Sequence, residues 1–167
     1  MPTLYILCGL PFSGKTTLAS QIVAQRGVAY VNIDHIKADE GYFVSDDQVP
    51  DADWPGIYDV VHASLLLPLR LGRDVLYDAS NLTRKERDDL RDLATKRGFA
   101  ARVIYVAVPE ATVRARWQAN KQTGERFDLP ASVFEEALEL FEEPARDEDV
   151  IVYAPTQDVS KWIKANF

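Results

Sequence analysis

Two kinds of hydrophobic pattern alternate along the chain. Short apolar runs at residues 4–8, 28–33, 74–78, 99–108 and 150–153 are typical of buried strands. Between these runs, apolar residues recur at intervals of three or four positions, which is typical of helices with one buried face. An alternation of strands and helices favours a parallel sheet covered on both faces, so we expect an α/β fold with five strands.

The predicted helices carry signals at their ends. Gly27 is suited to cap the C-terminus of the first helix, and Thr83 with Glu86 matches a capping box. Three prolines stand where further helices are expected to begin. In chain order, the predicted helices cover residues 17–26, 57–71 and 83–97, and three segments that begin near Pro109, Pro130 and Pro155.

Two of these helices have well-defined apolar stripes. In the helix over residues 57–71, Pro68 is expected to kink or shorten the last turns. Its expected inner face consists of Val60, Val61, Leu65 and Leu69. The helix over residues 83–97 is expected to bury Leu90, Leu93 and Ala94, and to keep most of its charged residues on a solvated outer face.

Residues 35–56 lack any such period. Asp46, Asp47 and nearby prolines interrupt the pattern, while Tyr42, Phe43 and Trp54 are large and apolar. This composition predicts an irregular excursion over the sheet edge. The segment is either part of a substrate pocket or a surface loop held by its aromatic side chains.

Composition sets broad limits. With 167 residues and 47% hydrophobic content, the chain suffices for one domain, residues 1–167, with a real core. No apolar run could span a bilayer and none resembles a signal peptide, so we expect no membrane contact and a cytoplasmic protein. The single cysteine, Cys8, is expected to be a small buried residue of the first strand.

Charge is distributed unevenly. The net charge is −7, yet residues 70–126 contain 13 Lys or Arg and 8 Asp or Glu. An acidic chain is a poor candidate for sequence-independent binding of long nucleic acid. The basic middle segment could serve anionic substrates, or it could consist of solvated helix faces.

Residues 9–16 read Gly-Leu-Pro-Phe-Ser-Gly-Lys-Thr, between a predicted strand and a predicted helix. This order fits G-x-x-x-x-G-K-[ST], the phosphate-binding P-loop motif. Its glycines allow a tight turn, Lys15 would balance the charge of the β- and γ-phosphates, and the Thr16 hydroxyl would bind Mg²⁺. We expect a nucleoside triphosphate to be held by Gly9, Pro11, Phe12, Ser13, Gly14, Lys15, Thr16 and Thr17.

Polar residues follow two of the predicted strands, at the edge where parallel sheets bind ligands. Asp34 and Asp78 come at strand ends, and Asn81 leaves the sheet just beyond the second. Asp78 ends a short run that resembles a Walker B strand, so it would serve either Mg²⁺ or a second substrate. His35 would point away from Asp34, and His62 is assigned a structural or surface role.

A basic helix–turn–helix follows, with Arg114, Arg116, Lys121 and Arg126. Residues 114–130 are expected to form a lid that stabilises phosphate oxygens and excludes water. The guanine-reading N-K-x-D sequence of GTPases is absent. Together with the P-loop and the two acids, these features favour phosphoryl transfer.

The chain resembles the P-loop kinases grouped with polynucleotide kinase, zeta toxin and chloramphenicol phosphotransferase. The matching stretches are GLPFSGKTT at 9–17, VNIDHIK at 31–37, LYDASNLTRKERDDLRDLA at 76–94, and a segment from Val108 through Arg116 and Arg126 to Pro144. The third stretch is the most specific of them. The resemblance implies ATP and Mg²⁺ as cofactors, the sheet order 2-3-1-4-5 and a small helical lid.

The resemblance also implies roles for single residues. Asp34 matches the acid that takes the proton of the acceptor hydroxyl, and Arg116 and Arg126 match lid arginines. The implied catalytic set is Lys15, Asp34, Arg116 and Arg126. The implied substrate-binding set is Asp34, Lys37, Asp78 and Asn81, and the implied metal-binding set is Thr16 and Asp78.

Three functions remain open at this point. The first is an ATP-dependent kinase acting on a hydroxyl of a small or medium-sized acceptor. The second is a polynucleotide 5′-hydroxyl kinase, and the third is a non-catalytic nucleotide-binding module; a zeta-type toxin with an antitoxin partner is a further variant. Members of the group differ in acceptor, so the resemblance indicates the reaction rather than the substrate. Base contacts are expected near residues 154–157.

Overall fold

A computed structural model describes residues 1–42 and 48–167. Its sheet has five strands: β1 (Thr3–Cys8), β2 (Ala29–Asn32), β3 (Val75–Asp78), β4 (Ala100–Val106) and β5 (Val150–Tyr153). All neighbouring strands are parallel, and their order is β2-β3-β1-β4-β5. The predicted α/β fold and sheet order are therefore confirmed.

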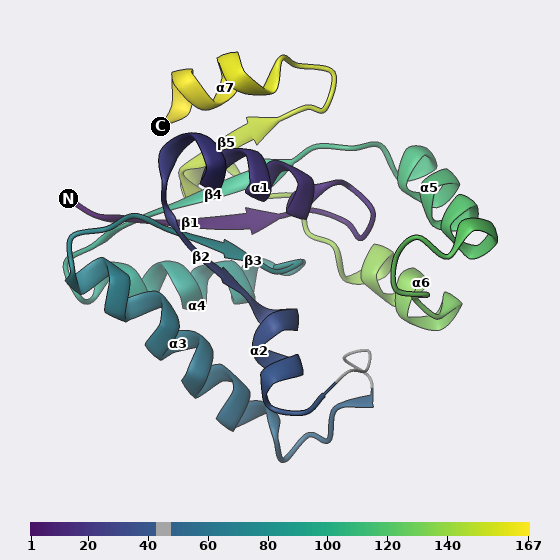
Figure 1. Ribbon diagram of the computed structural model, residues 1–167, viewed down its shortest axis with the longest axis horizontal. Helices are drawn as coiled ribbons and strands as arrows, with labels where there is room; N and C mark the ends of the chain where they lie inside the picture. The colour runs from purple at the N-terminus through teal and green to yellow at the C-terminus, as the bar shows by residue number, and fades with distance from the viewer. Residues whose placement is uncertain (43–47) are drawn as a thin grey trace.

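Helices cover both faces of this sheet (Figure 1). They are α1 (Lys15–Arg26), α2 (Ile33–Asp39), α3 (Trp54–Arg70), α4 (Arg84–Thr95), α5 (Glu110–Thr123), α6 (Ala131–Leu140) and α7 (Val159–Asn166), with a short 3-10 turn η2 at Arg146–Glu148. Helices α5 and α6 form an arm beyond the carboxyl ends of the strands. None of the helices within the described ranges is long and apolar enough to cross a membrane.

The sheet separates two apolar layers. On one face, Leu7 packs in a cluster with Ile22 of α1 and Ile163 of α7. On the other, Ile6 packs in a cluster with Leu65 of α3 and Leu90 of α4. Full burial of such a side chain contributes roughly 1.5–3 kcal/mol, so both layers hold the strand ends in fixed positions.

The segment after β2 departs from the prediction. The expected strand over residues 28–33 ends at Asn32, whose side-chain oxygen accepts hydrogen bonds from the backbone N–H groups of Asp34 and His35. This N-cap starts helix α2, so the first part of the segment expected to be irregular is helical. Asp34 lies in the first turn of α2 rather than at a strand end. The residues Phe43, Asp46 and Asp47 of the predicted excursion lie outside the described ranges.

Helix α3 begins three residues earlier than predicted, at Trp54. Pro55 stands in its first turn, where a missing N–H group costs nothing. Pro68 lies inside the helix, which continues to Arg70 and ends one residue before the predicted end. The prediction for Val60 was wrong, since 38% of this residue is exposed, whereas the other three predicted inner residues are buried.

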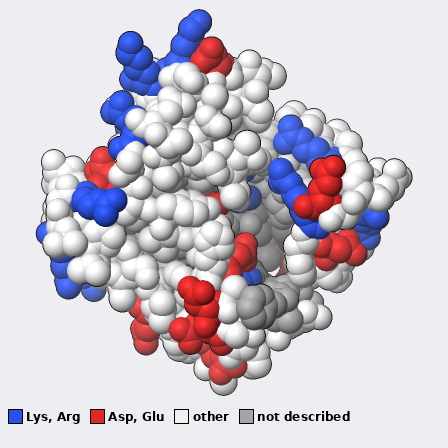
Figure 2. Space-filling model, viewed as in Figure 1, with Lys and Arg blue, Asp and Glu red and all other residues white. Residues whose placement is uncertain are grey.

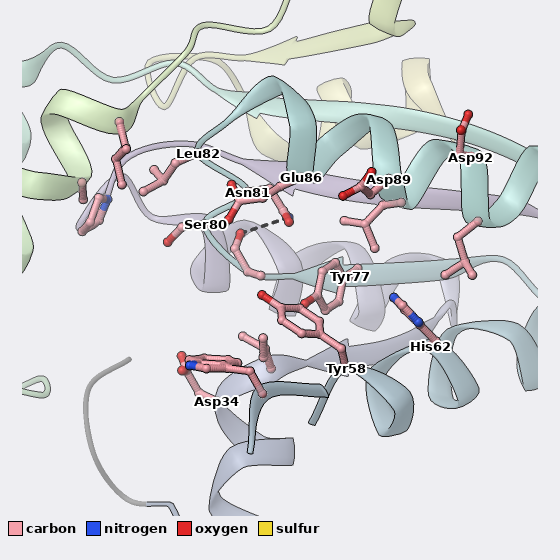
Figure 3. A pocket seen from close by; sticks show the side chains of 18 of the residues that line it. Asp34, Tyr58, His62, Tyr77, Ser80, Asn81, Leu82, Glu86, Asp89 and Asp92 are labelled. Atoms are coloured by element: carbon pink, nitrogen blue, oxygen red, sulfur yellow. Dashed lines mark hydrogen bonds between the residues drawn. The ribbon is translucent and has the colours of Figure 1, made fainter. Parts of the chain in front are cut away.

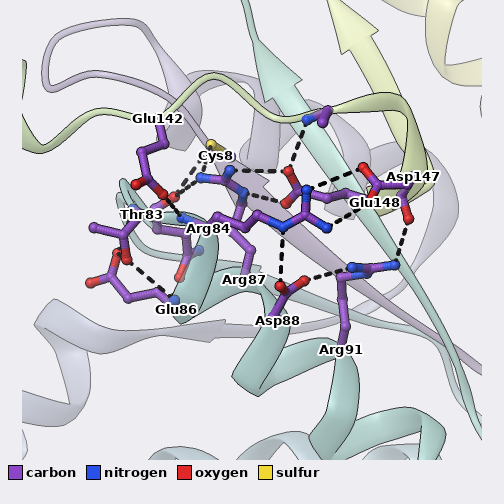
Figure 4. A network of polar contacts seen from close by, with 12 residues as sticks. Cys8, Thr83, Arg84, Glu86, Arg87, Asp88, Arg91, Glu142, Asp147 and Glu148 are labelled. Carbon is purple, nitrogen blue, oxygen red and sulfur yellow. Dashed lines mark hydrogen bonds and ion pairs between the residues drawn. The ribbon is translucent and has the colours of Figure 1, made fainter.

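Helix α4 has the predicted capping box of Thr83 and Glu86, and its charged residues are exposed or partly exposed with one exception. Arg87 is fully buried, as is its partner Glu148 from η2. Two hydrogen bonds of 2.6 and 3.2 Å join their charged groups. The same guanidinium donates to the carbonyl oxygens of Asn81 and Leu82 at 3.1 and 3.0 Å. Figure 4 shows this arginine joining α4, the turn after β3 and the segment before β5.

Cys8 is buried as expected, and burial raises the pKa of its thiol to about 11 from 9.0. At pH 8 the folded chain should therefore hold roughly a hundredfold less thiolate than an unfolded one. We expect iodoacetamide to alkylate Cys8 at least a hundredfold more slowly in the native protein than in urea. Mass spectrometry would follow the reaction, because the chain has a single cysteine. Equal rates would contradict the buried position.

Candidate active site

The P-loop connects β1 to α1 in a conformation that requires its glycines. Gly14 has φ 99°, a region that disfavours side chains. A Cβ atom at Gly9 would lie 3.0 Å from the carbonyl oxygen of Val106. Glycine at these two positions keeps the loop closely wrapped around the N-terminus of α1, where backbone N–H groups favour an anion.

Lys15 folds back over this loop. Its Nζ donates to the carbonyl oxygens of Gly9 and Leu10 at 2.9 and 3.0 Å. Burial lowers the pKa of Lys15, while the carboxylates of Asp78 and Asp34 oppose this shift. The lysine is thus in the electrostatic range of both acids that the sequence selected.

Ser13 adds a second sign of an anion site. Its side-chain oxygen is buried and, among the described residues, it is the single buried side-chain N or O atom without a hydrogen-bond partner. Such an atom costs free energy unless a ligand or water satisfies it. Its place inside the P-loop fits a bound phosphate group.

Asp78 is the centre of a polar cluster at the end of β3. Its Oδ2 atom accepts hydrogen bonds from the Thr16 hydroxyl at 2.8 Å, the Tyr30 hydroxyl at 2.7 Å and the Asn32 amide at 3.2 Å. Burial, followed by the bond to Asp78, raises the pKa of Tyr30, which keeps that hydroxyl protonated as a donor. The contact with Thr16 brings together the two residues predicted to bind metal.

The donor set of this cluster fits Mg²⁺. Mg²⁺ prefers oxygen ligands, retains several waters and uses substrate phosphates rather than an all-protein cage. The carboxylate of Asp78 and the hydroxyl of Thr16 are such ligands, and both adjoin the P-loop. In the ranges that the structure covers, no group of three or more His, Cys, Asp or Glu could hold a metal alone.

Asp34 and Lys37 form an ion pair on α2. The Lys37 Nζ lies 2.9 Å from an oxygen of Asp34, and the side chain of Asp34 is 74% exposed against 5% for Lys37. The carboxylate of Asp34 thus reaches solvent, while the buried ammonium group of Lys37 is its ion-pair partner. Lys37 lines neither of the two cavities beside the P-loop, and its role in substrate binding stays a prediction.

The polar groups of Asn81 make hydrogen bonds within the protein. Its amide donates to the carbonyl oxygen of Leu7 at 2.6 Å, and its own carbonyl accepts from Arg87. It also has φ 47°, in the left-handed region. These bonds fix the turn after β3 against β1, while the residue still borders the larger of two cavities.

The two arginines that the sequence predicted in a lid, Arg116 and Arg126, lie beside the P-loop. Arg116 on α5 donates to the carbonyl oxygens of Phe12 and Ser13 at 3.0 and 3.2 Å. Arg126 follows α5, and its backbone is held by the side chain of Asn120. Both arginines line a cavity of about 650 Å³, together with Gly14, Thr17, Tyr153 and Pro155. Pro155 lies within the stretch predicted to contact a base.

A larger cavity of about 1090 Å³ opens on the opposite side, bordered by Pro11 and Asp34. Figure 3 shows Tyr58 and His62 of α3 on one wall, and Glu86, Asp89 and Asp92 of α4 on the other. Figure 2 shows a hollow between the body of the molecule and the α5–α6 arm, with acidic side chains over α2 and the segment after it. The P-loop therefore separates two cavities of different character.

Several residues of the site were missed from sequence. Tyr30 and Asn32 donate hydrogen bonds to Asp78, but in the sequence both look like ordinary strand residues. The one available signal was that residues 30 and 32 lie on the same face of β2. Tyr58 and the acids of α4 read as exposed helix positions. Their common cavity depends on how α3 and α4 pack on the sheet, and the pattern of residues within one helix does not predict this packing.

Comparisons with known proteins agree with this geometry. A family model described as an AAA domain matches residues 4–144. No curated protein matches the chain by sequence. Among solved structures, an unliganded sugar kinase from Janibacter sp. HTCC2649 has a TM-score of 0.73 at 20% identity, with 99% of this chain and 92% of that chain covered.

Two other structures share the fold. A gluconokinase from Sinorhizobium meliloti 1021 has a TM-score of 0.67 at 21% identity, with 98% of this chain and 88% of that one covered. A chain of the Pnkp1/Rnl/Hen1 RNA repair complex has a TM-score of 0.69 at 23% identity, over 83% of this chain and 43% of that chain. The resemblance to P-loop kinases that the sequence indicated is confirmed.

Proposed function

Because this chain belongs to the AAA domain family of P-loop proteins, we propose that it transfers the γ-phosphoryl group of ATP to a hydroxyl of a small or medium-sized acceptor. The observation that carries the proposal is the pair of cavities on either side of the P-loop. One is lined by Gly14, Arg116 and Arg126, and the other by Pro11 and Asp34. A donor and an acceptor could thus meet at the loop.

Each side chain then has a role that its position supports. ATP would occupy the smaller cavity, with its phosphates against the P-loop and Lys15. Arg116 and Arg126, on a lid of about residues 114–130, would stabilise the transferring oxygens and exclude water. Thr16 and Asp78 would hold Mg²⁺, which when bound neutralises phosphate charge.

Asp34 would complete the reaction from the acceptor side. Its exposed carboxylate borders the larger cavity, where it can accept the proton of the acceptor hydroxyl. The bond from the γ-phosphorus to the β–γ bridging oxygen breaks as the bond to the acceptor oxygen forms. ADP leaves with the bridging oxygen, and Asp34 retains the proton until solvent removes it.

The direct test is transfer of label from γ-labelled ATP to a panel of acceptors. The panel contains sugars, amino alcohols, nucleosides and an oligonucleotide with a free 5′-hydroxyl. We expect label on a small acceptor and none on the oligonucleotide. Label on the oligonucleotide alone would favour the polynucleotide 5′-hydroxyl kinase, and ATP binding without transfer to any acceptor would favour the non-catalytic module.

Lys15→Ala tests the donor half of the proposal. The change removes the ammonium group that donates to the carbonyl oxygens of Gly9 and Leu10. Since a charge-assisted hydrogen bond contributes about 1.5–3 kcal/mol, the affinity for ATP should fall roughly tenfold to a hundredfold. Calorimetry of ATP binding would measure this. Lys161→Ala changes an exposed lysine of α7 that does not line the cavity and is the matched control. Equal ATP affinities of Lys15→Ala and the unmodified protein would show that Lys15 does not contribute to ATP binding.

A further inference from the structure

Asn32 is the last residue of β2, and the chain enters α2 directly after it (Figure 1). It lies opposite Asp78 in the parallel pairing of β2 with β3, and it is buried. Asp34, the proposed proton acceptor, follows two positions later in the first turn of α2. Asn32 therefore stands between the carboxylate proposed to hold Mg²⁺ and the carboxylate proposed to take the proton.

The two ends of the Asn32 side chain bind different parts of the site. Its Oδ1 atom accepts hydrogen bonds from the backbone N–H groups of Asp34 and His35 at 2.8 and 3.1 Å. Its Nδ2 group donates to Oδ2 of Asp78 at 3.2 Å and to the Tyr30 hydroxyl at 3.1 Å. The reversed amide would set an N–H group against two N–H groups and an oxygen against a carboxylate, so one orientation fits. A single side chain thus joins the start of α2 to Asp78.

Capping alone does not account for an asparagine at this position. Serine and aspartate cap helices about as well as asparagine does. Aspartate, however, has no donor for Asp78 and would place a second negative charge beside it, and serine has a shorter side chain whose one oxygen the cap occupies. Asparagine supplies the acceptor for the cap and the donor for the carboxylate from separate atoms, so residue 32 serves both.

The other contacts of α2 do not fix the direction of its first turn. The ion pair of Asp34 with Lys37 lies within the helix and moves with it. Ile33 and Ile36 pack against the apolar layer on this face of the sheet, but apolar packing is not directional. The hydrogen bonds of Asn32 are directional, and they connect the backbone of this turn to β3.

We propose that Asn32 is a positioning residue for phosphoryl transfer: by joining Asp78 to the first turn of α2, it holds the carboxylate of Asp34 in a fixed place relative to the proposed metal site. The role rests on the kinase activity proposed above and adds how its proton acceptor is placed. Asn32 lines neither of the two cavities beside the P-loop, so it acts through Asp34. A misplacement of about 1 Å in a reacting group can lower a rate about a hundredfold.

Asn32→Ser keeps the cap and removes the link. Serine can still accept from the N–H groups of α2, but its side chain is too short to reach Asp78. We expect single-turnover transfer of label at saturating ATP to fall about tenfold to a hundredfold, with an ATP affinity within about threefold of that of the unmodified protein. Transfer at the unmodified rate would reduce Asn32 to a helix cap and overturn the inference. A loss of ATP affinity as large as the loss of transfer would assign the effect to Asp78 alone and overturn it too.

A double-variant cycle tests whether Asn32 acts through Asp34. In the Asp34→Asn background there is no proton acceptor to position, so adding Asn32→Ser should change the transfer rate by less than about threefold. An effect as large as in the unmodified background would mean that the two residues act independently, which contradicts the proposed role.

Asn32→Ala and Asp158→Ala form a matched pair. Asn32→Ala removes both the cap and the link and should transfer label no faster than Asn32→Ser. Asp158→Ala removes the side-chain cap of α7 at a residue that lines neither cavity, and it should transfer label at the unmodified rate. If both alanine variants lost transfer equally, the effect would belong to helix capping in general, and the positioning role would be wrong.

Hydrogen exchange of the nucleotide-free protein, followed by mass spectrometry, measures the positioning without any transfer. The amides of residues 34–39 should exchange roughly threefold to tenfold faster in Asn32→Ser than in the unmodified protein, because a hydrogen bond to the sheet is lost. Unchanged exchange would overturn the positioning role.

The two proposals fail in different ways. If exchange rises as expected but no acceptor in the panel receives label from ATP, the kinase activity is wrong and the positioning of α2 by Asn32 stands. If the unmodified protein transfers label and Asn32→Ser transfers it equally fast, the kinase activity stands and the positioning role is wrong.

Discussion

Asp34→Asn should lower the rate of phosphoryl transfer by about a hundredfold to ten-thousandfold and leave the affinity for ATP unchanged. Asparagine keeps the shape of the side chain but cannot take a proton, and loss of a general base has effects of this size. ATP affinity should persist because Asp34 borders the larger cavity, whereas Gly14 and Arg116 border the smaller one. Single-turnover transfer of label at saturating ATP measures the effect.

Asp39→Asn is the matched control. This residue is also on α2 and exposed, but it does not line either cavity. The control should transfer label at the rate of the unmodified protein. Transfer by Asp34→Asn at that same rate would falsify the proton-accepting role, and a parallel loss of ATP affinity would point instead to a disturbed P-loop.

Arg87→Leu should lower the free energy of unfolding by about 3–5 kcal/mol. The change leaves the carboxylate of Glu148 buried without its cation, a situation that costs about this much. It also removes donors to the carbonyl oxygens of Asn81 and Leu82. Urea unfolding at pH 7, followed by circular dichroism, gives the value.

Two further variants separate burial from charge. Arg84→Leu removes an arginine of the same helix whose partner Asp147 is 63% exposed, and it should change stability little. Arg87→Leu/Glu148→Leu removes both buried charges and should recover part of the loss, since apolar pairs often replace buried ion pairs at little cost. A single Arg87→Leu variant as stable as Arg84→Leu would show that the buried pair carries no stability.

The sequence sufficed for the sheet and for the P-loop. Parallel strands buried on both faces read as continuous apolar runs, and the glycines, Lys15 and Thr16 of the loop are adjacent along the chain. The order of strands came from resemblance rather than from spacing. Asp78 was selected because an acid ends its strand, and its bond to Thr16 agrees with that choice.

The predictions from the sequence were wrong where a residue's environment depends on a partner elsewhere in the chain. Arg87 read as a surface arginine because its partner Glu148 is 61 positions away. Helix α2 was read as strand and loop because its start depends on the Asn32 side chain, a capping residue at what read as the interior of a strand. The aromatic and acidic walls come from two helices that are separated in sequence by all of β3, so neither helix reveals the cavity alone.

The division of the site by the P-loop has a consequence for how such an enzyme could diversify. Tyr58, Asp89 and Asp92 are exposed residues of the cavity wall and belong to neither apolar layer. Mutations there would be nearly neutral for folding and would leave the residues around Thr16 and Asp78 untouched. Substitutions on the exposed faces of α3 and α4 could therefore change which acceptor binds. The residues proposed to bind the nucleotide could stay the same in all descendants.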